Sequence, residues 1–568
     1  MTIKTYFRVV SLCLVVGLFS ACADENLAND KKENKPVAEV KGVKFTTGAP
    51  KMQAKLRSVV DDEGKIIPQT STRTFITHEI GKGADAFWDT NDYIWVKDKN
   101  NVWQKSIAIE LHDGGSSAEF TLPGASDDYA EGCAVCYTIT PSSLVDEADA
   151  AIIPFNQTQS APNDFSHAGR VGDSGIGTAH DKGNGMFNFE LQHLPHYLCF
   201  LPRCENASLA NNIRLTKIRL ENDNSDGTIE VVGATYLLDQ DPFNSVGIDT
   251  RYNVIELQST DGNGFPIAAT TADAAADACY MAILPGEHDL ILTYTIKDPT
   301  TNVEAKITKK VSGTFKAGEI TDVTANLTPM IFDDKYYMFD AQDEFWGGKY
   351  KQFQLTTNYT TETNADHFPK SRTSDPAYWA NEDLEQYKGI GPFQTATHSA
   401  AECPNINELK WFVTHGKDYF DENWVWATMN HLQKGGFWVK KLSVIAQEQH
   451  KNINDLKLAA PDGTDYRAQT TPFNEPYLSY ANGTPPDISD YFFIPLTGFY
   501  GYIDAPLAHI HEVRFTSLGA EGAGYYWSST PGCYLVAYGG SPGRAGLQLF
   551  SGSPLSGAKV WNSLHGWK

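Results

Sequence analysis

The chain has 568 residues, a formal net charge of -24 and a pI near 5.0. Such a length allows two to four domains, each with its own core. The acidic surplus repels phosphate backbones and no basic stripe offsets it, which excludes nucleic acid as an expected partner. Beyond the N-terminal region, no apolar run approaches the roughly 18 residues that a membrane-spanning helix needs.

Residues 1–21 are predicted to be a lipoprotein signal peptide. Lys4 and Arg8 precede an apolar run, Val9 to Phe19, that is too short to span a bilayer, and the small residues Ser20 and Ala21 suit a processing site. Cys22 follows directly. This arrangement resembles the lipobox of bacterial lipoproteins, in which the cysteine is lipidated and begins the mature chain, although Phe19 stands where Leu is usual. An ordinary signal peptide that ends near a cysteine is the alternative.

Lipidation of Cys22 would make it the membrane anchor. Two or more acyl chains, such as palmitate, hold a protein stably at about 0.8 kcal/mol per buried methylene. The acidic residues Asp24 and Glu25 that follow resemble the signal by which Bacteroidetes export lipoproteins to the outer face of the outer membrane. The expected location is therefore the cell surface.

Residues 22–71 are predicted to hold a tether and a first strand. The segment 24–35 is polar, charged and poor in aromatic residues, as disordered tethers are. Val37 to Thr47 alternates between apolar and polar residues, which predicts a strand. Arg57 and Arg73 follow in polar surroundings that are open to a trypsin-like protease.

Two β-sandwiches are predicted next, over residues 72–240 and 241–330. Short alternating segments are separated by turn residues and show hardly any helical period. Phe187 to Leu191 alternates without fault, and Lys217 interrupts a later alternation in a way that predicts a β-bulge.

A series of short motifs runs through this β region. They are Thr72-Arg73-Thr74, Phe87-Trp88, Asp92 to Val96, Tyr137 to Pro141 and Phe187 to Pro195, followed by paired Ile-x-Leu strands. Their order over residues 72–328 resembles the fimbrillin family of Bacteroidetes surface pilins, the subunits of type V pili. The resemblance implies two tandem transthyretin-like sandwiches in a lipoprotein precursor that an arginine-specific protease cuts.

In that family the cut removes the first strand and leaves a groove for the donor strand of a neighbouring subunit. Here the removable strand would be Val37 to Thr47, with Arg57 or Arg73 as the cut site. A sandwich without one strand exposes unpaired amides and an apolar slot, which strand addition from a partner relieves. Alternatively, both arginines are solvated loop residues and the first strand stays, as in an unprocessed anchor subunit.

Residues 331–568 are predicted to form an α+β domain rich in tryptophan. Ile406 to Val413 is expected to be a short amphipathic helix, and a second helix is expected from Trp424 to Gln433. A strand from Phe437 to Ile445 should follow. Further strands are predicted at Asp490 to Pro495, Gly524 to Thr530, Tyr534 to Tyr538 and Leu547 to Phe550.

Three segments of this region occur in a suggestive order: Cys403-Pro-x-x-x-Glu-Leu, Phe492 to Pro495 and Tyr525 to Thr530. They resemble the C-type-lectin-like domains of Bacteroidetes and Fibrobacter surface proteins, which some fimbrial tip subunits carry. Such domains include carbohydrate binders, and an exposed tryptophan stacks on the apolar face of a sugar. The candidate ligand-binding residues are Trp424, Trp426, Trp438 and Trp527. The alternative is that these side chains belong to the core.

The search for catalytic residues, cofactors and metal sites gives no candidate. Gly539 to Gly543 fits the G-x-S-x-G pattern, but Pro542 has no N–H to donate to an oxyanion, so no enzyme is predicted. Cys133-x-x-Cys136 and Cys199-x4-Cys204 lie in apolar, strand-like sequence that disfavours zinc knuckles. Seven cysteines remain after Cys13 and Cys22, and their pairing stays open.

The sequence therefore predicts a lipid-anchored, surface-exposed fimbrial subunit of the outer membrane. It is expected to sit at the tip, to join other subunits by strand addition and to bind a glycan or a surface protein. The alternative is a monomeric glycan-binding lipoprotein of a polysaccharide-uptake system, which would keep its N-terminal segment.

Overall fold

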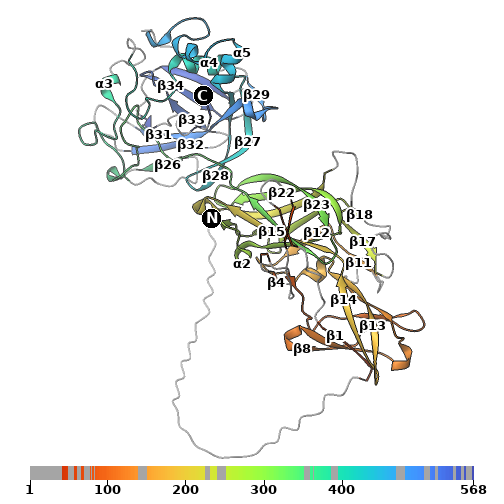
Figure 1. Ribbon diagram of the computed structural model, residues 1–568. Coiled ribbons are helices and arrows are strands. Elements are labelled where there is room, and N and C mark those ends of the chain that lie inside the picture. The colour runs from red at the N-terminus through yellow and green to blue at the C-terminus, as the bar shows by residue number, and fades with distance from the viewer. Residues whose placement is uncertain are drawn as a thin grey trace, which may run out of the picture. The chain divides into compact units, whose positions relative to one another are not determined.

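In the computed structural model, residues 42–568 form one compact unit, and the elements below all belong to it (Figure 1). The structure describes residues 41–48, 57–60, 66–69, 77–78, 80–81, 84–138, 150–223, 231–238, 251–350, 359–362, 364–385, 394–468, 480–503, 512–518, 522–540, 545–551, 556–557, 564 and 566–568. The prediction of a mainly β protein is confirmed.

An eight-stranded N-terminal sheet has the order β7-β6-β10-β13-β14-β1-β9-β8. Its strands are β1 (Val43–Gly48), β6 (Trp95–Lys97), β7 (Trp103–Lys105), β8 (Ala108–His112), β9 (Ser117–Leu122), β10 (Cys133–Thr138), β13 (Ser174–Gly183) and β14 (Met186–His193). The alternation predicted for Phe187 to Leu191 is confirmed, because Phe187, Phe189 and Leu191 enter one core.

Two sheets follow and form a middle sandwich. One has the order β12-β19-β16-β22-β23, and the other β20-β15-β24-β2-β3 with β21 beside β15. The first consists of β12 (Asn156–Gln159), β16 (Arg214–Asn222), β19 (Val254–Ser259), β22 (Gly286–Asp298) and β23 (Val303–Phe315). The second consists of β2 (Arg57–Val60), β3 (Ile66–Gln69), β15 (His196–Cys204), β20 (Ala268–Ala269), β21 (Cys279–Ile283) and β24 (Ile320–Asn326).

Apolar side chains from both of these sheets meet in one core, including Phe200, Leu257, Leu292 and Val323. The register of β16 against β22 shifts between Leu215 and Lys217, so the predicted irregularity is present. Residue 240 is not a boundary between sheets. Strands β15 and β16 precede it, yet β16 pairs with β19 and β22, and β15 with β21 and β24. Strand spacing along the sequence does not reveal such long-range pairing.

The outer face of the β15–β24 sheet carries a small second core. Tyr197, Cys199 and Leu201 of β15 point there, while Leu198 and Phe200 point into the sandwich. Short elements accompany this region: β4 (Thr77–His78), β5 (Ala84–Asp85), β11 (Ala150–Ile152), β17 (Gly233–Leu237), β18 (Arg251–Tyr252), α1 (Ala207–Ala210) and α2 (Ala274–Asp277).

Among its described residues, the C-terminal region has two sheets and four short α-helices around one aromatic core. The first sheet contains β25 (Met330–Ile331), β27 (Tyr419–Thr428), β28 (His431–Lys440), β29 (Ala481–Asn482) and β30 (Tyr491–Pro495). The second contains β26 (Tyr359–Glu362), β31 (Thr497–Ile503), β32 (Glu512–Leu518), β33 (Ala523–Trp527), β34 (Cys533–Tyr538), β35 (Gly546–Ser551) and β36 (Ser556–Gly557). The helices are α3 (Glu382–Glu385), α4 (Ile406–His415), α5 (Leu442–Glu448) and α6 (Ile453–Leu458).

The predicted helix at Ile406 is confirmed as α4, and its start is fixed by a capping box. The Asn405 side chain accepts the N–H groups of Asn407 and Glu408, and the Glu408 carboxylate accepts the Asn405 N–H. The predicted strands at Asp490, Gly524, Tyr534 and Leu547 correspond to β30, β33, β34 and β35.

The helix predicted from Trp424 to Gln433 is wrong. This segment is the hairpin of β27 and β28, turned by Met429 and Asn430, whose φ values of 52° and 64° suit a tight two-residue turn. The strand predicted from Phe437 to Ile445 is also only half right, because β28 ends at Lys440 and α5 begins at Leu442. Aromatic residues in this segment favour a strand, and that preference outweighs the helical spacing.

The hairpin tip is fixed to the middle sandwich by a buried polar contact. His431 Nδ1 lies 2.9 Å from Asp298 Oδ2, which also accepts the Leu432 N–H at 3.0 Å. Asp298 is fully buried at the end of β22, and Leu432 joins the core of the middle sandwich. A buried carboxylate needs such partners, so this contact sets where the hairpin turns.

All seven cysteines in the described part of the chain are free thiols. Within the same residues, no helix has the length and apolarity needed to cross a bilayer.

Asp277, at the end of α2, is a buried acid with an incomplete set of partners. Its side chain is 0 % exposed; Oδ2 accepts the Ala268 N–H, while Oδ1 has no hydrogen-bond partner in the described structure. Burial raises the pKa of Asp277 to about 7. The folded protein therefore holds a proton here that the unfolded chain releases above about pH 4.

We expect this proton to make stability fall as pH rises from about 4 to about 7, because folding must retain it. Asp277→Asn should remove that dependence and, relative to the unsubstituted protein, gain roughly 2 to 4 kcal/mol at pH 8 with little change at pH 4. Denaturant unfolding at both pH values measures the difference. Glu304→Gln, at an exposed acid of β23, is the control and should change neither value. An equal gain at both pH values would contradict the prediction.

Candidate functional site

The segment Val43 to Thr47 of the predicted removable strand belongs to β1, which lies inside the N-terminal sheet, whereas residues 37–40 of that prediction lie outside the described residues. Strand β1 pairs in parallel with β14, Phe45 opposite Phe187, and antiparallel with β9, Phe45 opposite Phe120. Both edges of β1 are therefore hydrogen-bonded. A strand from the extreme N-terminal part of the described chain occupies the sixth of eight places in the sheet.

Phe45 fixes β1 to the core. Its side chain is 0 % exposed, its ring stacks on Phe187 with centroids 4.7 Å apart, and Tyr129 meets it edge-on at 5.2 Å. On the other face of the strand, Lys44 Nζ lies 2.8 Å from the Glu119 carboxylate. Loss of β1 would leave a slot lined by aromatic side chains between β9 and β14, with a row of unpaired backbone groups on either side.

A second N-terminal segment is inserted in the middle sandwich. Strand β2 pairs in parallel with β24, and antiparallel with β3, where Arg57 is opposite Gln69. Arg57 thus begins a paired strand and does not lie in an open loop. Cys22 and Arg73 lie outside the described residues, as does Ser541 of the G-x-S-x-G segment.

The four predicted ligand-binding tryptophans divide into two groups. Trp426 and Trp527 are 0 % exposed and Trp438 is 3 % exposed, so all three lie in the core of the C-terminal region. Trp424 is only half-buried and packs edge-on against Trp438, with ring centroids 4.9 Å apart. Only Trp424 of these four lines a described pocket.

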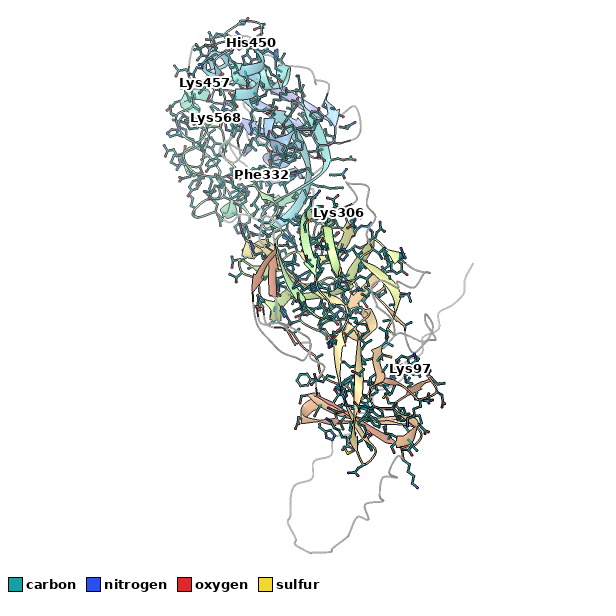
Figure 2. All side chains as sticks on the ribbon, turned by 45° about the vertical axis from the view of Figure 1, so that its right-hand side comes forward. Lys97, Lys306, Phe332, His450, Lys457 and Lys568 are labelled. Carbon is teal, nitrogen blue, oxygen red and sulfur yellow. The ribbon has the colours of Figure 1, made fainter. Side chains whose placement is uncertain are left out.

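The pocket that contains Trp424 has a volume of about 860 Å³ and lies between β23 and the hairpin of β27 and β28. Lys306, Lys309 and Lys434 line it, and Lys306 is labelled in Figure 2. The structure shows no ion pair for these three lysines among the described residues. Trp424 Nε1 is buried without a hydrogen-bond partner in the same part of the chain. Glu304 lines the pocket as well, so the pocket combines three lysines, one carboxylate and an aromatic ring.

Sequence reasoning missed the three lysines. They stand on two strands more than 120 residues apart, and only the packing of β27 and β28 beside β23 brings them together. No local sequence pattern joins them to Trp424.

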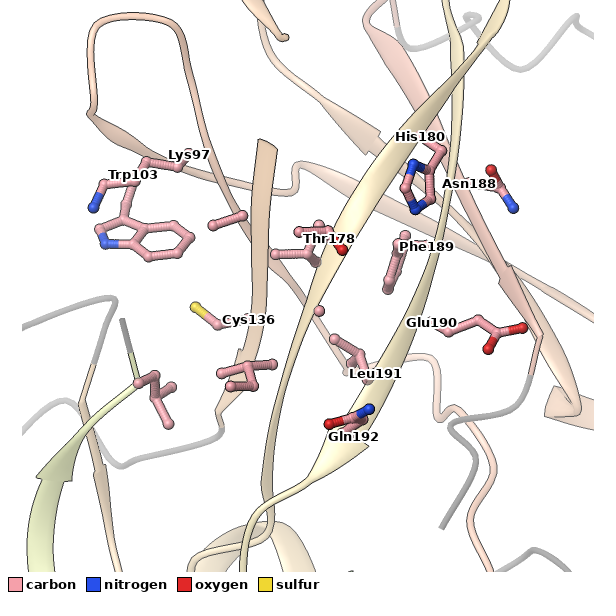
Figure 3. Close-up of a pocket in the computed structure, with 15 residues that line it drawn as sticks. Lys97, Trp103, Cys136, Thr178, His180, Asn188, Phe189, Glu190, Leu191 and Gln192 are labelled. Carbon is pink, nitrogen blue, oxygen red and sulfur yellow. The ribbon is translucent and has the colours of Figure 1, made fainter. Parts of the chain in front are cut away.

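Two other pockets lie elsewhere on the described structure, and the smaller of them is acidic. One of about 400 Å³ is lined by Asp421, Glu422, Asn423 and Tyr480 beside the β27 irregularity. The other, of about 730 Å³, lies on the outer face of the N-terminal sheet (Figure 3). Trp103 lies at one side of it in that view, and His180 and Asn188 at the other.

Comparison with known proteins gives likeness of structure only. No protein-family model matches the sequence, and no curated protein matches it. A candidate cell adhesion protein from Bacteroides uniformis is 12% identical, with 50% of this chain and 94% of that chain covered and a TM-score of 0.27. One from Bacteroides fragilis is 10% identical, with 50% and 93% covered and a TM-score of 0.26. The fimbrial anchor protein Mfa2 from Porphyromonas gingivalis is 10% identical, with 44% and 82% covered and a TM-score of 0.19. At such scores, none of these likenesses establishes a shared activity.

We expect Phe45→Ala to loosen β1 from its sheet. Removing a buried phenylalanine costs about 3 to 5 kcal/mol, because the ring leaves a cavity that the core fills only partly. Hydrogen–deuterium exchange should therefore become faster at the amides of β9 and β14 that pair with β1. The exchange rates of amides elsewhere in the protein should not change. Lys41→Ala, at an exposed position just before β1, is the control and should leave those amides protected. Unchanged exchange in Phe45→Ala would show that β1 contributes little to the sheet.

Proposed function

We propose that the protein is a lipid-anchored fimbrial subunit of the bacterial outer surface, that it stands at the tip of the fibre as an adhesin, and that it is not an enzyme. The observation that carries this proposal is the place of β1. A strand that precedes both candidate cut sites is paired on both edges and contributes Phe45 to the core. Cleavage after either arginine would free that strand and open a slot of the correct shape for a β-strand from a neighbouring subunit.

The position of Arg57 makes Arg73 the better cut site in this proposal. Cleavage after Arg57 requires the pairing of β2 with β3 and β24 to open first, since Arg57 belongs to that strand. Cleavage after Arg73 would detach β1 together with β2 and β3. Both the N-terminal sheet and the newly exposed edge of β24 would then accept a strand from a partner. Contacts between neighbouring subunits of the fibre would therefore involve two sheets.

We assign the N-terminal sheet and the middle sandwich to tandem transthyretin-like domains and residues 331–568 to a C-type-lectin-like domain. The two-sheet arrangement around the core of the middle sandwich supports the first assignment. The mixture of short helices and two sheets around one aromatic core supports the second. In this arrangement the chain attaches through Cys22, joins other subunits by strand addition and presents its C-terminal region to a ligand.

The ligand site that the geometry favours is the pocket of Trp424. The half-buried ring of Trp424 suits stacking on a sugar, and the three lysines, which outnumber the one carboxylate of Glu304, suit an acidic sugar. The proposed ligand is therefore a glycan that carries carboxylate or sulfate groups, and a surface protein is the alternative.

Replacement of Arg73 should block maturation. On cells that display the protein, Arg73→Ala should stay at full length and fail to enter high-mass assemblies, because β1 to β3 remain in place. Arg57→Ala should mature normally and is the matched control. Mass spectrometry of shed surface material reads both the new N-terminus and the assembly state.

An intact chain in the unsubstituted protein, monomeric and lipidated from Cys22, would instead identify a monomeric glycan-binding lipoprotein. The opposite result would be that Arg57→Ala blocks maturation and Arg73→Ala does not. It would place the cut in β2 and contradict the assignment of Arg73.

Replacement of Trp424 should weaken adhesion. On an array of acidic and neutral glycans, Trp424→Ala should lose at least about tenfold in affinity, the equivalent of about 1.4 kcal/mol from one lost stacking contact. Trp103→Ala is the matched control, because Trp103 is a half-buried tryptophan that lines the pocket of the N-terminal sheet. Circular dichroism of both variants checks that each is folded. A loss confined to Trp103→Ala would place the ligand in the N-terminal sheet and contradict the proposal.

A further inference from the structure

We propose that His78, Cys199 and Asp322 form a buried site for a divalent metal ion, with zinc the best match. The site lies on the outer face of the β15–β24 sheet and is separate from the pockets described above. It does not depend on the proposed fimbrial function, since it rests only on these three side chains and their packing.

The strand register brings two of the ligands together. Strands β15 and β24 run in parallel with Cys199 opposite Asp322, and both side chains point to the outer face of the sheet. The third ligand comes from β4, where His78 Nε2 contacts Asp322 Oδ1. One ligand atom from each residue lies within 4.8 Å of the other two.

All three residues are shielded from water. Cys199 is 0 % exposed, and the side chains of His78 and Asp322 are each 1 % exposed. Phe165, Tyr197 and Tyr280 form much of the surrounding outer core. An ion bound in such surroundings would be shielded from bulk solvent by the protein.

The donor set matches zinc in chemistry. A thiolate, an imidazole and a carboxylate are the three ligand types that zinc takes in proteins, with bonds of about 2.0 to 2.3 Å. Around such an ion the ligand atoms stand about 3 to 4 Å apart, and the three ligand atoms here already lie within 4.8 Å of one another. Since the described residues supply three ligands, a water molecule or another small ligand would complete the tetrahedron.

The Asp322 carboxylate is held in a fixed orientation in the metal-free cluster. Asp322 Oδ2 accepts the Gly81 N–H at 3.0 Å, and Oδ1 contacts His78, so the carboxylate is held in place. A divalent ion would be held by this carboxylate together with the thiolate form of Cys199, which releases its proton to solvent when the metal binds.

The sequence did not reveal this site because its ligands are far apart in the chain. The pattern Cys199-x4-Cys204 joined Cys199 to a residue that packs on the opposite face of β15, in the core of the middle sandwich. His78 and Asp322 enter only through the covering segment β4 and the parallel register of β24.

A metal at this position would tie two distant parts of the chain. His78 is five residues beyond Arg73, and Cys199 and Asp322 belong to the sheet that β2 joins. If the proposed cut after Arg73 occurs, the ion would hold the new N-terminal segment on the sheet whose edge the cut exposes.

The site is tested on the full mature chain with zinc and cobalt ions. After equilibration with zinc and removal of loosely bound metal, the protein should hold one zinc ion per chain. Its cobalt form should show the near-ultraviolet absorption that a thiolate ligand gives. Cys199→Ser should abolish that absorption and weaken zinc binding by at least about 100-fold, since even outer-shell substitutions cost about 10-fold to 100-fold.

Cys279→Ser is the matched control. Cys279 is an equally buried thiol on the neighbouring strand β21, but it points into the core of the middle sandwich. Cys279→Ser should bind zinc and cobalt as the unsubstituted protein does. Zinc should raise the melting temperature of Cys279→Ser and of the unsubstituted protein alike. Loss of fold in Cys199→Ser is checked by circular dichroism, and Asp322→Asn then serves as the second variant, with the same expected loss of metal.

Either of two results would overturn the proposal. One is an unsubstituted chain that retains no zinc. The other is Cys199→Ser that binds as tightly as Cys279→Ser, which would make the cluster a buried His–Asp contact beside an uninvolved thiol.

Discussion

The pairing of β1 on both edges is the constraint on which the N-terminal sheet depends. Backbone groups buried in a sheet must be hydrogen-bonded, and β9 and β14 find those partners in β1. Phe45 adds apolar packing to the same strand. A chain whose earliest described strand completes a sheet in this way is stable only while that strand, or an equivalent one from elsewhere, occupies the slot. This makes strand exchange a physical possibility for the molecule.

The middle sandwich links this early segment to the rest of the chain. Strand β2 extends the sheet of β15 and β24, while Asp298 of the facing sheet holds His431 at the tip of the C-terminal hairpin. The middle sandwich therefore pairs through its backbone with the early strand β2 and makes a polar contact with His431 of the C-terminal region. Strand β24, between β15 and β2 in this sheet, also contacts β4 through Asp322 and His78.

The sequence predicted the local parts of this structure better than their assembly. Alternation located β1 and β14, and the capping residues around Asn405 fixed α4, because these signals involve neighbouring residues. The hairpin around Trp424 was misread as a helix, since its apolar spacing fits both periods and only the turn at Asn430 decides between them. Strand pairing across residue 240 left no local signal at all.

The candidate sites follow the same physical division. Trp424 was found because tryptophan is a rare and informative residue, but its burial and its lysine neighbours depend on two strands packing side by side. Cys199 was noticed and joined to the wrong partner, because sequence distance says nothing about which face of a strand a side chain takes. In a protein built from long-range β pairing, the strand register therefore decides which side chains meet. His78, Cys199 and Asp322 form one cluster only when β4, β15 and β24 are in place.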